Sequence, residues 1–181
     1  MSDIKKTMRD VFIEGLYQEM SENGKLFLLS ADFGAPALDK IRTDFPSRFI
    51  NVGIAEQNLI NVATGLALEG FIVYAYAIAP FLVMRAYEQI RNNLSLLSHM
   101  KDVNVNIIGV GAGLSYDVSG PTHHCIEDLT LIRALPNIQL FSPSDWKLAK
   151  KFIEYSIKVN NPKYIRFDGK PVSGIYENIS A

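Results

Sequence analysis

The order of apolar and polar positions predicts a chain in which strands and helices alternate. The first helical pattern is capped by Thr7 and stopped by Gly24, and its apolar positions are Met8, Val11, Phe12, Leu16 and Met20. Short apolar runs, typical of buried strands, cover 25–30, 48–52, 71–77, 103–110, 138–142 and 163–167. Helical patterns lie between them at 36–44, 56–68, 81–100, 126–135 and 143–159.

Strands that are apolar throughout and separated by helices are typical of a parallel sheet covered on both faces. We therefore predict an α/β fold: a doubly wound, mostly parallel six-stranded sheet with helices on both faces. The domain is expected to cover residues 1–168. Residues 169–181 hold two glycines and a proline and no apolar period, so we interpret them as a linker-like tail toward an absent C-terminal domain.

Composition and charge narrow the class of protein. Hydrophobic residues make up 48% of the 181 positions and charged residues 20%, as in globular domains. A net charge of −1 offers no basic field for nucleic acid or an anionic membrane. The single cysteine, Cys125, suits a reducing compartment, and the charged start has no apolar signal-peptide core. The longest apolar run, 71–84, is shorter than the roughly 20 residues of a membrane span. We expect a cytoplasmic protein with no nucleic-acid or membrane partner.

Ligands of open α/β sheets bind outside the carboxyl ends of the strands. Four loops are expected there: 31–34 with Asp32, 53–56 with Ile54 and Glu56, 78–81, and 111–124. Glu56 opens a helix that carries no other charge before Glu69. This carboxylate either complements the helix dipole or binds a ligand nitrogen in the crevice, and the residues alone leave both readings open.

Three segments carry a resemblance to a known family. "NVGIAEQNLINVATGLALEG" (51–70), "RAYEQIRN" (85–92) and "GPTHHCIEDLTLIRALPNIQLFSPSD" (120–145) resemble the pyrimidine-binding domain of the transketolase family. That family uses thiamine diphosphate and includes 1-deoxyxylulose-5-phosphate synthase. The resemblance extends from about residue 6 to residue 166, and the three segments have the family's order and spacing.

The resemblance implies roles for the cofactor-side residues. Glu56 would hydrogen-bond N1′ of the cofactor's aminopyrimidine, favouring the tautomer that removes the proton from C2 of the thiazolium. Phe81 would stack on the pyrimidine, while Ile78 stands where many transketolases carry a second aromatic residue. Asp32 and Ile54 would belong to the cofactor-binding loops, although Asp32 could equally be a helix cap.

The resemblance also implies a substrate side. His123, in "GPTHH", would contact the donor sugar near the reacting carbonyl as a hydrogen-bond donor or proton relay. His124 is its neighbour and would point elsewhere. Arg166, on the last strand, resembles an arginine that can serve phosphate binding, but a strand-end arginine is more often part of a surface ion pair. The candidate substrate-binding residues are His123, His124, Ser119 and Arg166. Two positions depart from the family: Ser119 replaces an aspartate, and Gly111 replaces a histidine that helps to hold the substrate phosphate. These changes weaken the expectation of a sugar phosphate. Arg85 and Gln89 are expected to be structural or interfacial.

The family's segment for the diphosphate and its divalent cation, Gly-Asp-Gly…Asn, is absent from the sequence, and no metal-ligand spacing replaces it. We therefore expect thiamine diphosphate with Mg²⁺ held by a partner domain, a homodimer of this domain, and an added diphosphate-binding subunit. The predicted function is that of the pyrimidine-binding subunit or fragment of a transketolase-like transferase that moves a ketol or acyl unit between sugar-type substrates.

Three alternatives remain open. The chain could be a fragment of a 1-deoxyxylulose-5-phosphate synthase-type carboligase. It could be the beta subunit of a 2-oxo-acid dehydrogenase, which shares the "GIAEQ" turn. It could also be a non-catalytic partner module that kept the fold. A natural split subunit and a piece of a longer chain are equally compatible with the sequence.

Overall fold

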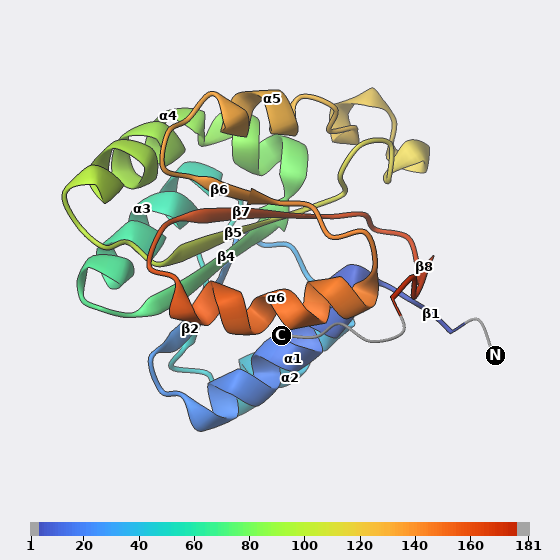
Figure 1. The fold of residues 1–181 in the computed structure, drawn as a ribbon, viewed down its shortest axis with the longest axis horizontal. Helices are drawn as coiled ribbons and strands as arrows, with labels where there is room; N and C mark the ends of the chain where they lie inside the picture. Colours follow the sequence, from blue (N-terminus) through green and yellow to red (C-terminus); the bar gives the residue numbers. More distant parts are fainter. Residues whose placement is uncertain (1–3, 177–181) are drawn as a thin grey trace.

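The computed structural model describes residues 4–176, and over this range the predicted sheet is confirmed (Figure 1). Its six strands have the spatial order β3-β2-β4-β5-β7-β6, and every neighbouring pair is parallel. They are β2 (Leu26–Ser30), β3 (Phe49–Asn51), β4 (Ile72–Ile78), β5 (Val105–Val110), β6 (Gln139–Phe141) and β7 (Lys163–Phe167). All six lie within a residue or two of their predicted positions.

Helices cover both faces of the sheet, as predicted for a doubly wound fold (Figure 1). One face carries α1 (Met8–Glu22), α2 (Pro36–Asp44) and α6 (Trp146–Lys158). The other face carries α3 (Glu56–Leu68), the helical turns η1 (Phe81–Arg85), α4 (Tyr87–Gln89), η2 (Ile90–Leu96) and η3 (Leu97–His99), and α5 (Asp128–Arg133). Among the helices over residues 4–176, none has both the length and the hydropathy of a membrane span.

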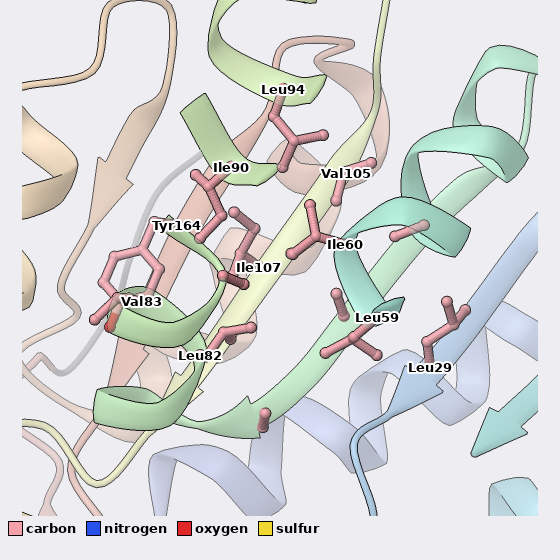
Figure 2. Close-up of a cluster of buried hydrophobic side chains, with 14 of the residues drawn as sticks. Leu29, Leu59, Ile60, Leu82, Val83, Ile90, Leu94, Val105, Ile107 and Tyr164 are labelled. Carbon is pink, nitrogen blue, oxygen red and sulfur yellow. The ribbon is translucent and has the colours of Figure 1, made fainter. Parts of the chain in front are cut away.

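The core on the α3 side of the sheet fixes two chain segments that matter for the site. Leu59 and Ile60 of α3 and Leu82 and Val83 of η1 are fully buried in one cluster on β4 and β5 (Figure 2). Side chains of this kind contribute about 1.5–3 kcal/mol each when removed from water. The first residue of α3 and the first residue of η1 are therefore held firmly on the same side of the sheet.

The predicted continuous helix over 81–100 is corrected by the structure. Residues Phe81–Arg85 and Ile90–Leu96 form π-helical turns, and Leu97–His99 forms a 3₁₀ turn. Ala86, between the first π turn and α4, has φ −102° and ψ 18°, outside the helical range. The number of residues per turn is similar in α, π and 3₁₀ helices. The spacing of apolar residues over a few turns therefore cannot distinguish them. π turns often occur at functional sites, where they change the direction of side chains.

The structure adds a small element that the sequence did not indicate. β1 (Lys5–Lys6) pairs antiparallel with β8 (Val172–Ser173). Beyond β8, Asp145 accepts hydrogen bonds from the backbone N–H of Ile175 and Tyr176. The first part of the expected linker-like tail is thus attached to the domain. The rest of that tail, 177–181, lies outside the described residues, and a further domain stays a prediction.

Candidate active site

The loop before α3 holds Glu56 at the carboxyl edge of the sheet. Gly53 has φ +76°, a left-handed conformation that glycine adopts without strain. The Asn51 side chain accepts hydrogen bonds from the backbone N–H of Gly53 and of Asp32, both at 3.0 Å. The chain then enters α3 directly at Glu56, whose surface is only 3% exposed. The isolated glutamate of the sequence is therefore a buried carboxyl group.

Asp32 connects two of the predicted loops. Its Oδ1 accepts a 2.9 Å hydrogen bond from Nδ2 of Asn51, which joins the loops after β2 and β3. Asp32 itself has φ +50°, which aspartate tolerates better than most residues. The alternative that Asp32 caps a helix is wrong, because the N-cap of α2 is Ala35. Ile54, in the second loop, is 76% exposed. The cofactor roles of Asp32 and Ile54 stay predictions.

Arg85 lies next to Glu56, which the sequence did not indicate. Its Nη1 donates a 2.7 Å hydrogen bond to Oε2 of Glu56, and the Arg85 side chain is 48% exposed. The expectation that Arg85 is only structural or interfacial therefore misses a direct contact with the candidate catalytic acid. The sequence holds no specific signal for this contact, since an arginine four residues after Phe81 is ordinary on a helical segment.

Phe81 and His123 extend this group of side chains. Their ring centroids are 5.1 Å apart with an interplanar angle of 73°, an edge-on aromatic contact. The guanidinium carbon of Arg85 lies 5.5 Å from the Phe81 ring centroid. Glu56, Arg85, Phe81 and His123 thus form one continuous series of contacts. The structure brings three residues that were predicted separately, Glu56, Phe81 and His123, to one place.

The remaining loop residues lie outside this series among the described contacts. Ser119 ends an exposed 3₁₀ turn, Asp117–Ser119. His124 is partly buried, and its Nε2 has no hydrogen-bond partner among the described residues. The substrate roles predicted for Ser119 and His124 stay predictions.

Arg166, predicted to bind substrate, is held in an ion pair. Its Nε and Nη2 donate to the two carboxylate oxygens of Asp128 at 2.8 and 3.2 Å. The hydroxyl of Tyr164 donates to Asp128 as well, at 2.9 Å, and burial together with this carboxylate raises the pKa of Tyr164 well above its ordinary value. As long as the ion pair with Asp128 stays intact, Nη1 is the guanidinium nitrogen of Arg166 that could contact a substrate.

Gly111 shows why a side chain is absent at this position. Its φ is +91°, and a Cβ atom added there would lie 2.2 Å from Cε2 of Tyr116. The Tyr116 ring thus fills the space in front of Gly111 at the carboxyl end of β5. A histidine at position 111, which the family resemblance implies, has no room beside this ring.

The chemistry available to the group follows from its members. Glu56 offers a buried carboxyl group, Phe81 an aromatic face, and His123 an imidazole with Nδ1 3.1 Å from the Thr122 hydroxyl. Such a set can hydrogen-bond and stack a flat nitrogen heterocycle and move a proton next to it. Over residues 4–176 no cluster of three or more His, Cys, Asp or Glu side chains could hold a metal ion.

Residues 4–170 match the family described as "Transketolase, pyrimidine binding domain". The chain belongs to the transketolase family. The match covers the parallel sheet and the whole series from Glu56 to His123, so the resemblance carried by the three sequence segments is confirmed.

Curated relatives of this transketolase-family domain include subunits and longer enzymes. One of the subunits of an apulose-4-phosphate transketolase, from Actinobacillus succinogenes, is 40% identical over 75% of this chain and 42% of its own length. A putative transketolase C-terminal section of Methanocaldococcus jannaschii is 35% identical over 98% of this chain and 55% of its own length. A 1-deoxy-D-xylulose-5-phosphate synthase of Methylacidiphilum infernorum is 31% identical over 96% of this chain and 27% of its own length. The chain spans about half the length of the subunit-type relatives.

A solved structure is similar as well. It is described as a split gene transketolase, inactive beta4 tetramer, and shares 35% identity with a TM-score of 0.78. The superposition covers 96% of this chain and 54% of that one. Fold and sequence thus agree on the same family.

Proposed function

We propose that this domain is the pyrimidine-binding half of a thiamine-diphosphate-dependent, transketolase-like transferase that moves a ketol or acyl unit between sugar-type substrates. The observation that supports this most is the buried carboxyl group of Glu56 beside an aromatic ring and an imidazole. A glutamate that only complemented the helix dipole could remain in contact with water and would not have to be buried.

The residues present fit the aminopyrimidine of the cofactor. With Oε2 of Glu56 occupied by Arg85, Oε1 is free to meet a ring nitrogen, and Phe81 offers a face for stacking. When bound, the thiazolium ring of the cofactor supplies a carbon nucleophile and an electron sink for carbon–carbon bond cleavage. Glu56 holds and returns a proton at the ring nitrogen. Its burial keeps water from competing for that proton.

His123 acts on the substrate side of the same group. Its Nδ1 lies within hydrogen-bond distance of Thr122 Oγ1, which leaves Nε2 for a substrate oxygen. The edge-on contact with Phe81 fixes the imidazole next to the ring that would face the cofactor. His123 thus orients the substrate carbonyl and relays a proton to the oxygen on which charge develops.

A second polypeptide or domain completes the site in this proposal. In it, a partner binds the metal and the diphosphate, as the lack of a Gly-Asp-Gly…Asn segment in this sequence leads us to expect. Two relatives are subunit-type proteins, and a similar split-gene chain forms an inactive beta4 tetramer. These facts support association with other chains. The homodimer of this domain and the diphosphate-binding subunit are our proposal. We expect the assembly to work in the cytoplasm.

The experiment that tests the function combines this chain with the polypeptide that carries the Gly-Asp-Gly…Asn segment. Thiamine diphosphate and Mg²⁺ are added, and exchange of the C2 proton is followed by NMR. Fast exchange is expected only in the two-chain mixture, with a loss of about 10²-fold or more in Glu56→Gln. The control is Glu69→Gln, because Glu69 is the exposed C-cap of the same helix. Equal exchange in wild type and Glu56→Gln would contradict the proposal.

The donor then separates the related enzyme classes. Turnover of a ketose donor supports the transketolase reaction. The similarity to a 1-deoxy-D-xylulose-5-phosphate synthase makes pyruvate with an aldehyde acceptor the second donor to test. Acyl transfer from another 2-oxo acid would indicate the dehydrogenase beta subunit instead, and a mixture without any C2 exchange would indicate a non-catalytic partner module.

A further inference from the structure

The ion pair between Arg85 and Glu56 differs from an ordinary surface pair. Glu56 is almost fully buried, whereas Arg85 reaches it from the solvent side of η1. By comparison, the Arg42–Asp39 pair on α2 has both side chains about two-thirds exposed. A carboxylate that is removed from water needs a partner, because its desolvation is otherwise strongly unfavourable.

The contact is also one-sided. Only Nη1 of Arg85 donates, and it donates to Oε2. A two-pronged arginine–carboxylate pair would occupy both oxygens, but here Oε1 is left without a protein donor among the described hydrogen bonds. The pair therefore orients the carboxyl group and leaves one oxygen for another partner.

The surroundings hold Arg85 in this position. Arg85 ends the π turn that begins at Phe81, and its guanidinium lies over the Phe81 ring. Leu82 and Val83, between them, are fully buried in the core. The π turn thus places the aromatic face and the guanidinium group side by side at the start of α3.

We propose that Arg85 is a positioning residue for Glu56. Its guanidinium fixes the carboxyl group through Oε2 and directs Oε1 to the heterocycle nitrogen. This inference rests on the proposed function, since it assigns the setting in which Glu56 works. His123 contacts the Phe81 ring, over which Arg85 lies. Asp32 is hydrogen-bonded to Asn51, which in turn accepts from Gly53 in the loop before Glu56.

The first test measures C2-proton exchange against pH in the two-chain mixture. Arg85→Met and Arg85→Gln are expected to slow exchange about tenfold, a part of the 10²–10⁴-fold that a positioned acid or base supplies. The loss should extend over the whole profile, because the carboxyl group is no longer held through Oε2. Arg85→Lys keeps a charged donor and should restore most of the rate.

The matched control is Arg91→Met. Arg91 is an exposed arginine on η2, and its Nη1 donates to Asn92 rather than to a carboxylate. This variant should keep the wild-type rate and profile. Urea unfolding shows which variants are folded. Of Arg85→Met and Arg85→Gln, the more stable one is then compared with wild type.

A second test needs no cofactor and uses the full chain labelled with ¹³C at the glutamate carboxyl groups. The Glu56 signal is identified by its loss in Glu56→Gln, and its chemical shift is compared between variants at one neutral pH. The shift should change in Arg85→Met, where the hydrogen bond to Oε2 is lost, and should match wild type in Arg91→Met. An unchanged Glu56 signal in Arg85→Met would overturn the inference.

The two proposals fail in different ways. If Glu56→Gln exchanges C2 protons like wild type, the proposed function is wrong. If Glu56→Gln is inactive while Arg85→Met keeps the wild-type rate and pH profile, the function stands and the positioning role of Arg85 is wrong. A slow Arg85→Met that Arg85→Lys does not restore, with an unchanged Glu56 carboxyl signal, would also count against positioning and indicate a packing role.

Discussion

Arg166 of β7 donates two hydrogen bonds to the carboxylate of Asp128, the first residue of α5. No surface of Asp128 is exposed, and Tyr164 supplies a third donor. Asp128 follows His124 by four residues, so the pair fixes the end of the loop that carries His123 to the sheet. This interaction therefore helps to place the imidazole of His123, for which we propose a substrate role.

Replacing Asp128 by Asn should destabilise the fold by about 3 kcal/mol, because the mostly buried guanidinium group of Arg166 then lacks its counter-charge. Urea unfolding at neutral pH measures this change. The control is Asp39→Asn, which breaks the exposed pair with Arg42 and should change stability by less than about 1 kcal/mol. If both variants lost a similar free energy of unfolding, the burial of Asp128 would not be the reason for the contribution of the Asp128–Arg166 pair.

The thiol of Cys125 should be unreactive in the folded protein. Burial, together with the nearby Asp128 carboxylate, raises the pKa of Cys125 to about 12, and its side chain is fully buried. Only the thiolate reacts with alkylating agents. At pH 8 we expect iodoacetamide to modify folded Cys125 at least about 100-fold more slowly than the urea-unfolded chain. Mass spectrometry follows the reaction, and rapid modification of the folded protein would contradict the burial.

The strand and helix order could be predicted because each buried element carries a strong local pattern. Runs such as 72–78 are apolar on both faces, and a strand in that state must lie inside a covered parallel sheet. The pair β1–β8 had no such pattern, since each strand has two residues and both are at least partly exposed. Its partners are also far apart in the sequence, so only the folded chain shows the pairing.

Some residues of the candidate site could be predicted from the sequence and others could not. Glu56 could be found because an isolated charge before an apolar helix is unusual, and the family resemblance then chose between its two readings. Arg85 could not, because an arginine on a helix is ordinary until its partner is known to be buried. Gly111 and Tyr116 show the same limit: the sequence shows a missing side chain, whereas the structure shows the ring that fills its space.

Asp145 should make the attachment of residues 175 and 176 sensitive to acid. Burial alone would raise the pKa of this carboxyl group, but hydrogen bonds from the backbone N–H of Leu148, Ile175, Tyr176 and Lys147 outweigh it and lower the pKa below 3.8. The folded protein therefore binds this proton less readily than the unfolded chain. The stabilisation is fully present above about pH 4 and is lost as the pH falls through the folded-state value.

The variant that tests this is Asp145→Asn, which should lower the free energy of unfolding by about 1 kcal/mol near neutral pH. Urea unfolding of wild type and variant is compared at pH 7, 5 and 3. The difference should stay constant between pH 7 and 5 and shrink at pH 3, where the unfolded wild-type chain takes up the proton more readily than the folded protein. A difference that is the same at all three values would exclude the charge as its source.

Gly111 offers the sharpest test of how the substrate side departs from the family. Gly111→Ala should destabilise the fold by about 2 kcal/mol, because the new Cβ meets the Tyr116 ring and the backbone has φ +91°. The control is Gly65→Ala, inside α3, where a Cβ meets no atom within 4 Å and should stabilise the helix by about 0.5–1 kcal/mol. Urea unfolding measures both.

A double-mutant cycle with Tyr116→Ala then separates the ring from the backbone. If the ring excludes a side chain, Gly111→Ala should be clearly less destabilising in the Tyr116→Ala background, and only the backbone strain should remain. An equal loss in both backgrounds would mean that backbone conformation alone demands glycine. In the first case Gly111→His needs Tyr116→Ala beside it before the chain can hold the imidazole found in the family. This pair of positions, rather than Gly111 alone, would then determine the shape of the substrate pocket.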